Sequence, residues 1–260
     1  MKKVNKSGPP DLFREFETQY PNASWRDFSD YDEGKAYKEA KKRIFEDQGQ
    51  LCAYCETRIE SSPEQSYLQR IEHFHEKSDN TNTEKNWTLD WANLIGVCKG
   101  GSGGENKNSD GTSIFPTPEN LSCDAFKGHL VVKGVLPAGC EGKLINPLLL
   151  SASPSMLEPN DKFCDEFVVE DNKCDSVKDL VEQTIEVLNL NCDRLNKQRL
   201  EVSYEHNRLL KKAREMNNKE IFEVLAERWF RHHWPSFFTT RRILLGPHAE
   251  MYLQRINYDG

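Results

Sequence analysis

The apolar positions of this chain recur mostly with the spacing of an α-helix. Residues 35–48 carry one apolar stripe, which predicts a helix that ends at Gly49. The stripe consists of Ala36, Ala40, Ile44 and Phe45. In the segment before it, Trp25, Phe28 and Tyr31 also follow helical spacing, and we expect them to pack inside the protein. Residues 1–50 are therefore predicted to form an N-terminal helical segment.

The last third of the chain has the same helical character. Residues 176–188 form another apolar stripe, with Ser176 as a candidate N-cap. A second helix is predicted from Asp193 to about Met216, and a third from Lys219 to about Phe230. Residues 176–260 are therefore predicted to form a C-terminal helical region.

The middle of the chain, residues 51–175, has a different pattern. Two short apolar runs, at 130–132 and 167–169, resemble strands between turns. Residues 99–120 contain five glycines and two prolines among polar residues, which predicts a loop. The chain is therefore expected to belong to the α+β class, with a small central domain between two helical regions.

Composition places few limits on the function. The chain has 260 residues, of which 30% are charged and 37% hydrophobic, as in a soluble protein with a core of its own. It has no apolar run of membrane-spanning length, and its basic start is followed by no apolar stretch, so we expect a cytoplasmic protein without a secretory signal or a membrane contact.

The net charge of -7 is unevenly distributed. Residues 51–130 carry 7 lysines and arginines against 12 acidic residues, whereas residues 176–260 carry 14 against 12. An acidic central part is compatible with a divalent metal site, and the basic side chains concentrate towards the C-terminus. The charge therefore neither requires nor excludes a nucleic-acid substrate.

Eight cysteines in a chain without a signal indicate metal ligands or reduced core thiols rather than disulfides. Cys52 and Cys55 have the C-x2-C spacing that lets two thiolates bind one tetrahedral Zn²⁺ from a tight turn. Cys98 and Cys123 stand at the two ends of the glycine-rich stretch, so we predict a structural zinc site of these four thiolates, here called the zinc knot. The alternative is that some of them are ordinary buried thiols. Cysteines without paired spacing are expected to be core thiols, and these are Cys140, Cys164, Cys174 and Cys192.

Further residues with metal-binding or catalytic side chains lie between and beside these cysteines. In chain order the set is Cys52-x2-Cys55, Glu72-His73, Asn93-Leu94, Cys98, Cys123-Asp124 and Lys127. This order resembles the HNH endonuclease superfamily, whose fold is a two-stranded hairpin packed on a helix around one divalent metal. A typical member has Asp where this chain has Glu72, and Asn where it has Asp124. Both replacements keep an oxygen ligand.

The resemblance implies a role for each residue. His73 would be the general base that takes a proton from the attacking water. Glu72 and Asp124 would hold Mg²⁺ or Mn²⁺ at the scissile phosphate. Asn93 would form hydrogen bonds across the hairpin loop and fix the orientation of His73.

Other side chains near the motif are candidates for secondary roles. Lys77 and Lys127 could contact phosphate oxygens. His129 is an alternative ligand, because many HNH sites end in a histidine, but Asp124 ranks first because it directly follows the last cysteine. We expect His75 to be an ordinary structural histidine, because an exposed His-x-His pair more often has no direct role.

The resemblance narrows to one subgroup. The segments that carry it are 48–56, 71–74, 93–98, 123–128, 145–147 and 187–191. Together they resemble PtuB, the HNH component of Septu-type and retron-associated anti-phage systems, over roughly residues 48–199. This likeness implies a nuclease held by an ABC/SMC-like ATPase of the PtuA type, in retron systems with a reverse transcriptase and its DNA, and acting on nucleic acid during phage infection.

The C-terminal region mixes cations with aromatic residues at 206–214 and 228–234. This mixture suits contacts with phosphates and stacked bases, but also a solvated helix face over an aromatic core. A third interpretation is that the region docks the ATPase partner.

Two alternatives to a nuclease remain. A zinc-ribbon module that binds nucleic acid or protein without cutting would share the zinc knot, but it would not need Glu72, His73, Asn93 and Asp124. A thiol redox protein would use Cys52 and Cys55 as reactive thiols, which the four-cysteine spacing disfavours.

Overall fold

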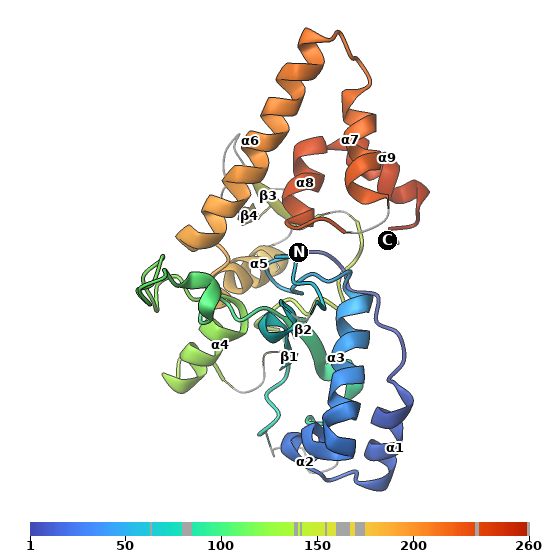
Figure 1. The fold of residues 1–260 in the computed structure, drawn as a ribbon, viewed down its shortest axis with the longest axis vertical. Coiled ribbons are helices and arrows are strands. Elements are labelled where there is room, and N and C mark those ends of the chain that lie inside the picture. Colours follow the sequence, from blue (N-terminus) through green and yellow to red (C-terminus); the bar gives the residue numbers. More distant parts are fainter. Residues whose placement is uncertain are drawn as a thin grey trace.

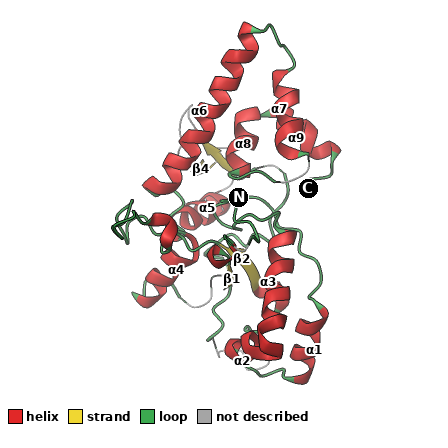
Figure 2. Cartoon of the chain, in the orientation of Figure 1, coloured by secondary structure: helices red, strands yellow, loops and turns green. Residues whose placement is uncertain are grey.

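The structure, a computed structural model, has helices at both ends and a small two-stranded sheet between them (Figure 1). The structure describes residues 1–62, 64–79, 85–137, 140, 142–153, 155–159, 167–169, 175–231 and 234–258. Helices dominate, and the strands are few and short (Figure 2). The fold thus mixes helices and strands, as the sequence predicted.

The N-terminal segment contains three helices, α1 (Asp11–Gln19), α2 (Trp25–Asp30) and α3 (Lys35–Asp47). The prediction of a helix over 35–48 is confirmed. Helix α2 starts with a capping box, in which the Ser24 hydroxyl accepts from the backbone N–H of Asp27 while the Asp27 carboxylate accepts from that of Ser24. Phe13, Phe16 and Phe28 form a buried aromatic cluster between the helices, which packs against α3.

The central sheet is an antiparallel pair of strands, β1 (Arg70–His73) and β2 (Leu94–Val97), with His73 opposite Leu94. The end of α3 fixes the register, because the Gln48 side chain accepts from the Gly96 backbone N–H at 2.7 Å and donates to its carbonyl at 2.8 Å. A Cβ atom at Gly96 would lie 2.8 Å from the Phe45 ring. Only glycine therefore allows α3 to approach β2 this closely.

Helix α4 (Cys123–Val132) packs beside the sheet. The run Leu130–Val132, expected to be a strand, is the last turn of this helix. Three consecutive apolar residues suit either structure, and here the helix continues from Cys123 without a break. Short 3-10 turns are also present, namely η1 (Tyr31–Gly34), η2 (Ser66–Leu68), η3 (Trp91–Asn93) and η4 (Gly104–Asn106). Apart from η4, residues 99–120 form the expected loop.

A second small sheet pairs β3 (Leu157–Pro159) with β4 (Phe167–Val169), so the strand predicted at 167–169 is confirmed. Helix α5 (Asp175–Val187) follows it. Because α5 begins at Asp175, Ser176 is the second residue of the helix and not its N-cap.

The C-terminal region consists of α6 (Asp193–Glu215), α7 (Ile221–Phe230), α8 (Phe238–Leu245) and α9 (Pro247–Arg255). The first two confirm the predicted helices, whereas α8 and α9 were not predicted individually. The start of α6 is part of the central core, since Leu195 and Val202 belong to the same buried cluster as Cys52 and Cys98. The rest of α6 extends away from that core and returns through α7 (Figure 1).

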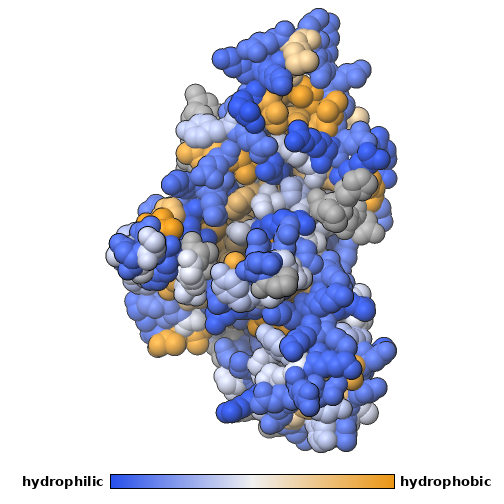
Figure 3. Space-filling view, in the orientation of Figure 1, coloured by the Kyte–Doolittle hydropathy of each residue, from blue (hydrophilic) through white to orange (hydrophobic). Residues whose placement is uncertain are grey.

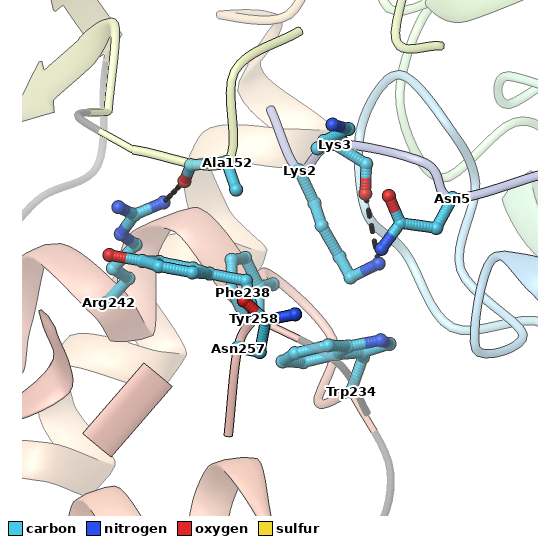
Figure 4. Close-up of a pocket in the computed structure, with 9 residues that line it drawn as sticks. All are labelled: Lys2, Lys3, Asn5, Ala152, Trp234, Phe238, Arg242, Asn257 and Tyr258. Carbon is cyan, nitrogen blue, oxygen red and sulfur yellow. Dashed lines mark hydrogen bonds between the residues drawn. The ribbon is translucent and has the colours of Figure 1, made fainter. Parts of the chain in front are cut away.

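The first residues of the chain and residues of α8 line a cavity of about 230 Å³ (Figure 4). Lys2 Nζ lies 4.5 Å from the centre of the Trp234 ring and donates to the Lys3 carbonyl at 3.0 Å. On the other side of the cavity, Arg242 donates to the Ala152 carbonyl at 2.7 Å. The contact of Lys2 with Trp234 joins the start of the chain to the C-terminal region, and none of the candidate site residues lines the cavity.

Within the part of the chain that the structure describes, no helix has both the length and the apolar character needed to cross a membrane.

Candidate functional site

The four cysteines of the predicted zinc knot lie together. Their Sγ atoms are all within 4.8 Å of one another, and all four side chains are buried. Cys52 and Cys55 stand on a tight turn, which is closed by hydrogen bonds from the Cys52 N–H to the Thr57 carbonyl and from the Glu56 N–H to the Cys52 carbonyl. Among the described residues this is the one group of three or more potential metal ligands.

The other half of the knot joins the end of β2 to the start of α4. Cys98 directly follows β2, and Cys123 is the first residue of α4. The loop between them is held at its base, because the Ser122 N–H donates to the Gly100 carbonyl at 2.9 Å and the Gly100 N–H donates to the Cys98 Sγ at 3.3 Å. A Cβ at Gly100, whose φ is +59°, would lie 2.0 Å from the Ser122 carbonyl oxygen, so this position requires glycine.

The chemistry of the knot fits Zn²⁺. Four thiolates at this separation match its preferred tetrahedral sulfur coordination. Burial raises the pKa of the Cys123 thiol, whereas hydrogen bonds from Cys123 and Cys52 lower that of Cys55. The guanidinium of Arg194, buried at the start of α6, donates to the Ser122 hydroxyl at 2.6 Å and supplies positive charge beside the sulfur cluster. A bound zinc ion would deprotonate the remaining thiols.

Glu56, the residue after Cys55, links the knot to the C-terminal helices. Its buried carboxylate accepts from the backbone N–H of Thr239 at 2.7 Å and from the Thr239 hydroxyl at 2.6 Å. Its backbone carbonyl accepts from the Phe237 N–H at the start of α8. The Met1 ammonium lies 3.5 Å from the same carboxylate. This contact was not predicted from the sequence.

The candidate carboxylates Glu72 and Asp124 come together where α4 packs on β1. They lie within hydrogen-bonding reach of each other, and each pairs with a cation. Lys127 Nζ is 2.6 Å from Glu72 Oε1, and Arg70 Nη1 is 3.2 Å from Asp124 Oδ2. Burial raises the pKa of Glu72 to about 8, while the neighbouring ammonium of Lys127 opposes that shift. Two adjacent carboxylates form a hard oxygen donor set of the kind that Mg²⁺ and Mn²⁺ use.

The buried hydroxyl of Tyr54 is consistent with a further polar group bound in this region. It makes no hydrogen bond to any described residue. Burial and the charges of Glu72 and Asp124 together raise its pKa well above the usual value. A buried hydroxyl without a partner is uncommon, and a metal or its bound water near the carboxylates fits such a position.

The candidate base His73 ends β1 and is buried. Its Nε2 lies 3.1 Å from the Thr88 carbonyl, and its ring meets that of Trp25 edge to face at 4.6 Å. Because a carbonyl oxygen only accepts, the neutral ring carries its proton on Nε2 and keeps a lone pair on Nδ1. Burial lowers the pKa of His73 to about 4, so the ring is neutral at pH 7.

Asn93 bridges the loop that connects β1 and β2. Its side-chain oxygen accepts from the His75 N–H at 2.7 Å. Its amide group donates to the carbonyls of His75 and Trp87, both at 2.9 Å. The backbone of Phe74 also donates to the Asn93 carbonyl at 2.9 Å. Asn93 therefore fixes the backbone that directly follows His73.

The remaining candidates lie in different environments. Lys77 is exposed on the loop, whereas Lys127 is buried and donates to Glu72 and to the carbonyls of His73 and Phe74. In this arrangement Lys127 faces the protein and not the solvent.

Neither of the two alternative histidines is part of a cluster of three or more ligands among the described residues. His75 stacks on Trp87 with ring centres 3.8 Å apart and meets Asp79 at 2.7 Å. His129 lies on α4, where it lines a cavity together with residues of the glycine-rich loop.

Of the other cysteines, Cys140 and Cys192 are buried in the central core, as expected for core thiols. Cys164 and Cys174 lie outside the described residues, as do His232 and His233 of the basic and aromatic segment at 228–234.

Several contacts of the candidate site were not predicted. Trp25 was expected only to pack in the core, but its ring contacts His73. Arg70 and Thr88 were not singled out, because a lone arginine and a backbone carbonyl carry no recognisable signal in one sequence. The carboxylate pairs and the hairpin thus depend on tertiary packing that spacing alone does not reveal.

A comparison with known proteins finds a relative over almost the whole chain. The chain is 34% identical over 255 residues to the protein named "Retron Ec83 putative HNH endonuclease" of Escherichia coli, and the match covers 94% of each chain. No family model matches the chain. A likeness of this extent defines the class of protein as an endonuclease, a phosphodiester hydrolase. The chain belongs to the family of HNH endonucleases of the retron-associated type.

Proposed function

We propose that the hairpin β1–β2 and helix α4 form the ββα-metal core of a metal-dependent nuclease. The observation that carries the proposal is that His73, with its Nε2 proton held by the Thr88 carbonyl, directly follows a carboxylate that faces Asp124. The zinc knot clamps the same elements, since Cys98 follows β2 and Cys123 begins α4. A binding module would need the knot but not this arrangement.

Each candidate site residue has a role in the proposed hydrolysis. Glu72 and Asp124 would hold Mg²⁺ or Mn²⁺, which stabilises negative charge on the phosphate and its leaving oxygen. His73 accepts the proton of the attacking water at Nδ1, the ring nitrogen that keeps its lone pair. Asn93 fixes the backbone after His73, and Lys127 holds Glu72 in place. Lys77, which is exposed on the loop, is the candidate for a phosphate contact.

The substrate and partners follow from the same proposal. We place the enzyme in the cytoplasm, where a zinc knot of reduced thiols is stable, as the effector of an anti-phage complex. The partner is an ABC/SMC-like ATPase of the PtuA type, and in a retron system a reverse transcriptase and its DNA join the complex. The name of the Escherichia coli relative supports the retron association.

The α6–α7 hairpin is the proposed docking region for the ATPase. An apolar patch lies over this end of the molecule, on a face that is otherwise mostly hydrophilic (Figure 3). A cavity of about 320 Å³ at the hairpin is lined by the apolar residues Leu210, Ile221 and Phe222 and by the cations Arg214 and Lys219, among others. An apolar surface with cations around it suits a protein interface.

Point variants test the docking region better than a deletion, because Leu195 and Val202 of α6 belong to the central core. The variant Leu210→Glu should lose co-purification with the ATPase, whereas the exposed Tyr204→Glu on the same helix should keep it. Unchanged co-purification of Leu210→Glu would exclude this surface as the docking site.

The nuclease itself is tested by incubating plasmid DNA and total RNA with the full chain, with and without the ATPase, in Mg²⁺, in Mn²⁺ and in EDTA. Cleavage of either polymer that requires a divalent ion supports the proposal and identifies the substrate. A zinc-loaded protein that cuts neither polymer in any of these conditions would instead support the zinc-ribbon binding module.

A further inference from the structure

A large aromatic side chain is exposed directly before strand β1. Tyr67, on the turn η2, is 55% exposed. The ammonium of Lys99 lies 5.0 Å from the centre of its ring. Lys99 directly follows the knot residue Cys98, so the well-fixed end of β2 holds it in place. One exposed aromatic residue is ordinary, but a cation held beside its ring makes it a candidate contact surface.

Two further cations come from positions near Tyr67 in the structure or in the sequence. Lys41 on α3 donates to the carbonyl of Ser66 at 3.2 Å, one residue away. Arg70 follows three residues later, and its side chain is 49% exposed. Among the described residues, Lys41 and Lys99 have no carboxylate partner, so their charges are available to an anion. We call Lys41, Tyr67, Arg70 and Lys99 the basic–aromatic strip.

The strip leads to the candidate carboxylates. Arg70 Nη1 contacts Asp124 Oδ2, and Glu72 lies on the same face of β1 because side chains alternate along a strand. Tyr67 is separated from Arg70 by at most about 10 Å of extended chain. A nucleic-acid strand whose scissile phosphate sits at Glu72 and Asp124 could therefore lay an adjoining nucleotide on Tyr67.

The chemistry of the strip selects the kind of strand. Ammonium groups bind phosphates of any nucleic acid, but an exposed aromatic ring can stack only on a base that is not already paired and stacked within a duplex. The chain as a whole has a net charge of -7, which does not favour a broad electrostatic grip on duplex phosphates. We propose that the basic–aromatic strip binds an unpaired nucleotide next to the cleavage site, which makes single-stranded nucleic acid the preferred substrate; this inference rests on the proposed nuclease function.

Binding of fluorescein-labelled strands tests the inference without requiring cleavage. The probes are one short mixed-sequence oligonucleotide as DNA and as RNA, each alone and annealed to its complement, and Kd is measured by anisotropy in the His73→Ala background. We expect tighter binding of a single strand than of its duplex. Tyr67→Ala should weaken single-strand binding about tenfold, as loss of one stacked base does, and should leave duplex binding unchanged.

Matched variants separate stacking from a general loss of structure. Tyr67→Phe should bind as tightly as the parent, because it keeps the ring. Tyr20→Ala, which removes a tyrosine that is 44% exposed directly after helix α1, should have no effect. Lys99→Gln should weaken binding of single strands. It should not steepen the dependence of Kd on salt concentration. Equal single-strand affinity in Tyr67→Ala and its parent, or an equal loss for single strand and duplex, would overturn the inference.

The test distinguishes this inference from the nuclease proposal. If Tyr67→Ala loses single-strand affinity but the wild-type protein cuts nothing in Mg²⁺ or Mn²⁺, the strip is supported and the nuclease proposal fails. If the wild-type protein cuts with a divalent ion and Tyr67→Ala binds normally, the nuclease proposal stands and the strip is excluded.

Discussion

The Nζ atom of Lys127 lies 2.6 Å from Oε1 of Glu72 and joins helix α4 to strand β1. Both side chains are largely buried, and the same ammonium donates to the backbone carbonyls of His73 and Phe74. This one side chain therefore positions a candidate metal ligand and the strand end that carries the candidate base.

Replacing Lys127 by methionine should destabilise the protein. Methionine fills similar space but leaves the buried Glu72 carboxyl and the carbonyls of His73 and Phe74 without their donor. The loss should be about 1–3 kcal/mol of the free energy of unfolding, because Glu72, with its raised pKa, takes up a proton instead of remaining a bare buried charge. Urea denaturation of the zinc-loaded protein measures the loss. Lys133→Met, at the exposed end of α4, should change the stability by less than about 0.5 kcal/mol. A Lys127→Met protein as stable as the wild type would contradict the role assigned to the ion pair.

Loss of a knot ligand should remove the zinc. Purified protein should contain about one equivalent of zinc, and Cys55→Ser should lose most of it together with thermal stability, because the metal holds the turn, β2 and α4 together. Elemental analysis and a melting curve measure both. Cys140→Ser, also a buried cysteine but outside the cluster, should keep its zinc. A Cys55→Ser protein with a full zinc content would show that the cluster is not a metal site.

Asn93→Ala should reduce cleavage more strongly than it reduces the stability of the fold. It leaves the His75 N–H and two carbonyls without their partner, which should cost about 1–3 kcal/mol. Because the loop fixes the backbone after His73, cleavage should fall roughly a hundredfold, as small misplacements of a catalytic group do. Single-turnover rates on a labelled substrate measure this. The exposed Asn108→Ala should behave as the wild type, and a normal rate for Asn93→Ala would remove its positioning role.

Stability should depend on pH through His206. This side chain is buried between α6 and α7, near the rings of Phe222 and Trp229, and burial lowers its pKa. Below about pH 6.5, the ordinary pKa of histidine, the unfolded chain takes up a proton that the folded chain excludes. Stability should therefore fall as the pH decreases from 6.5 towards the lowered folded-state value.

Guanidinium denaturation at several pH values from 8 to 5 tests this dependence. His206→Gln should show a shallower decrease in the free energy of unfolding than the wild type over that interval. Identical slopes for the two proteins would mean that His206 does not contribute to the pH dependence.

The sequence predicted several helices and the clustering of four cysteines, because these signals are local or chemically distinctive. The stripe over 35–48 became α3, and four cysteines far apart in the chain meet as their spacing and residue type indicated. The strand predicted at 130–132 was wrong, because a short apolar run does not distinguish a strand from the last turn of α4.

The contacts that define the site depend on tertiary structure. That Trp25 from the N-terminal segment would contact His73, or that Arg70 would pair with Asp124, could not be inferred from spacing. Lys127 shows the same limit, because its position in the motif suggested a phosphate contact whereas its side chain is buried against Glu72. The catalytic roles of these residues stay predictions until they are tested.

The most direct measurement is the cleavage rate of His73→Ala beside the wild type, on the nucleic acid that the wild type cuts, with Mg²⁺ or Mn²⁺ and equal zinc content. Loss of a general base should lower the rate by about 10²–10⁴-fold while the melting temperature and zinc content remain close to those of the wild type. A His73→Ala enzyme that is folded, zinc-loaded and as fast as the wild type would contradict the assignment of His73 as the base.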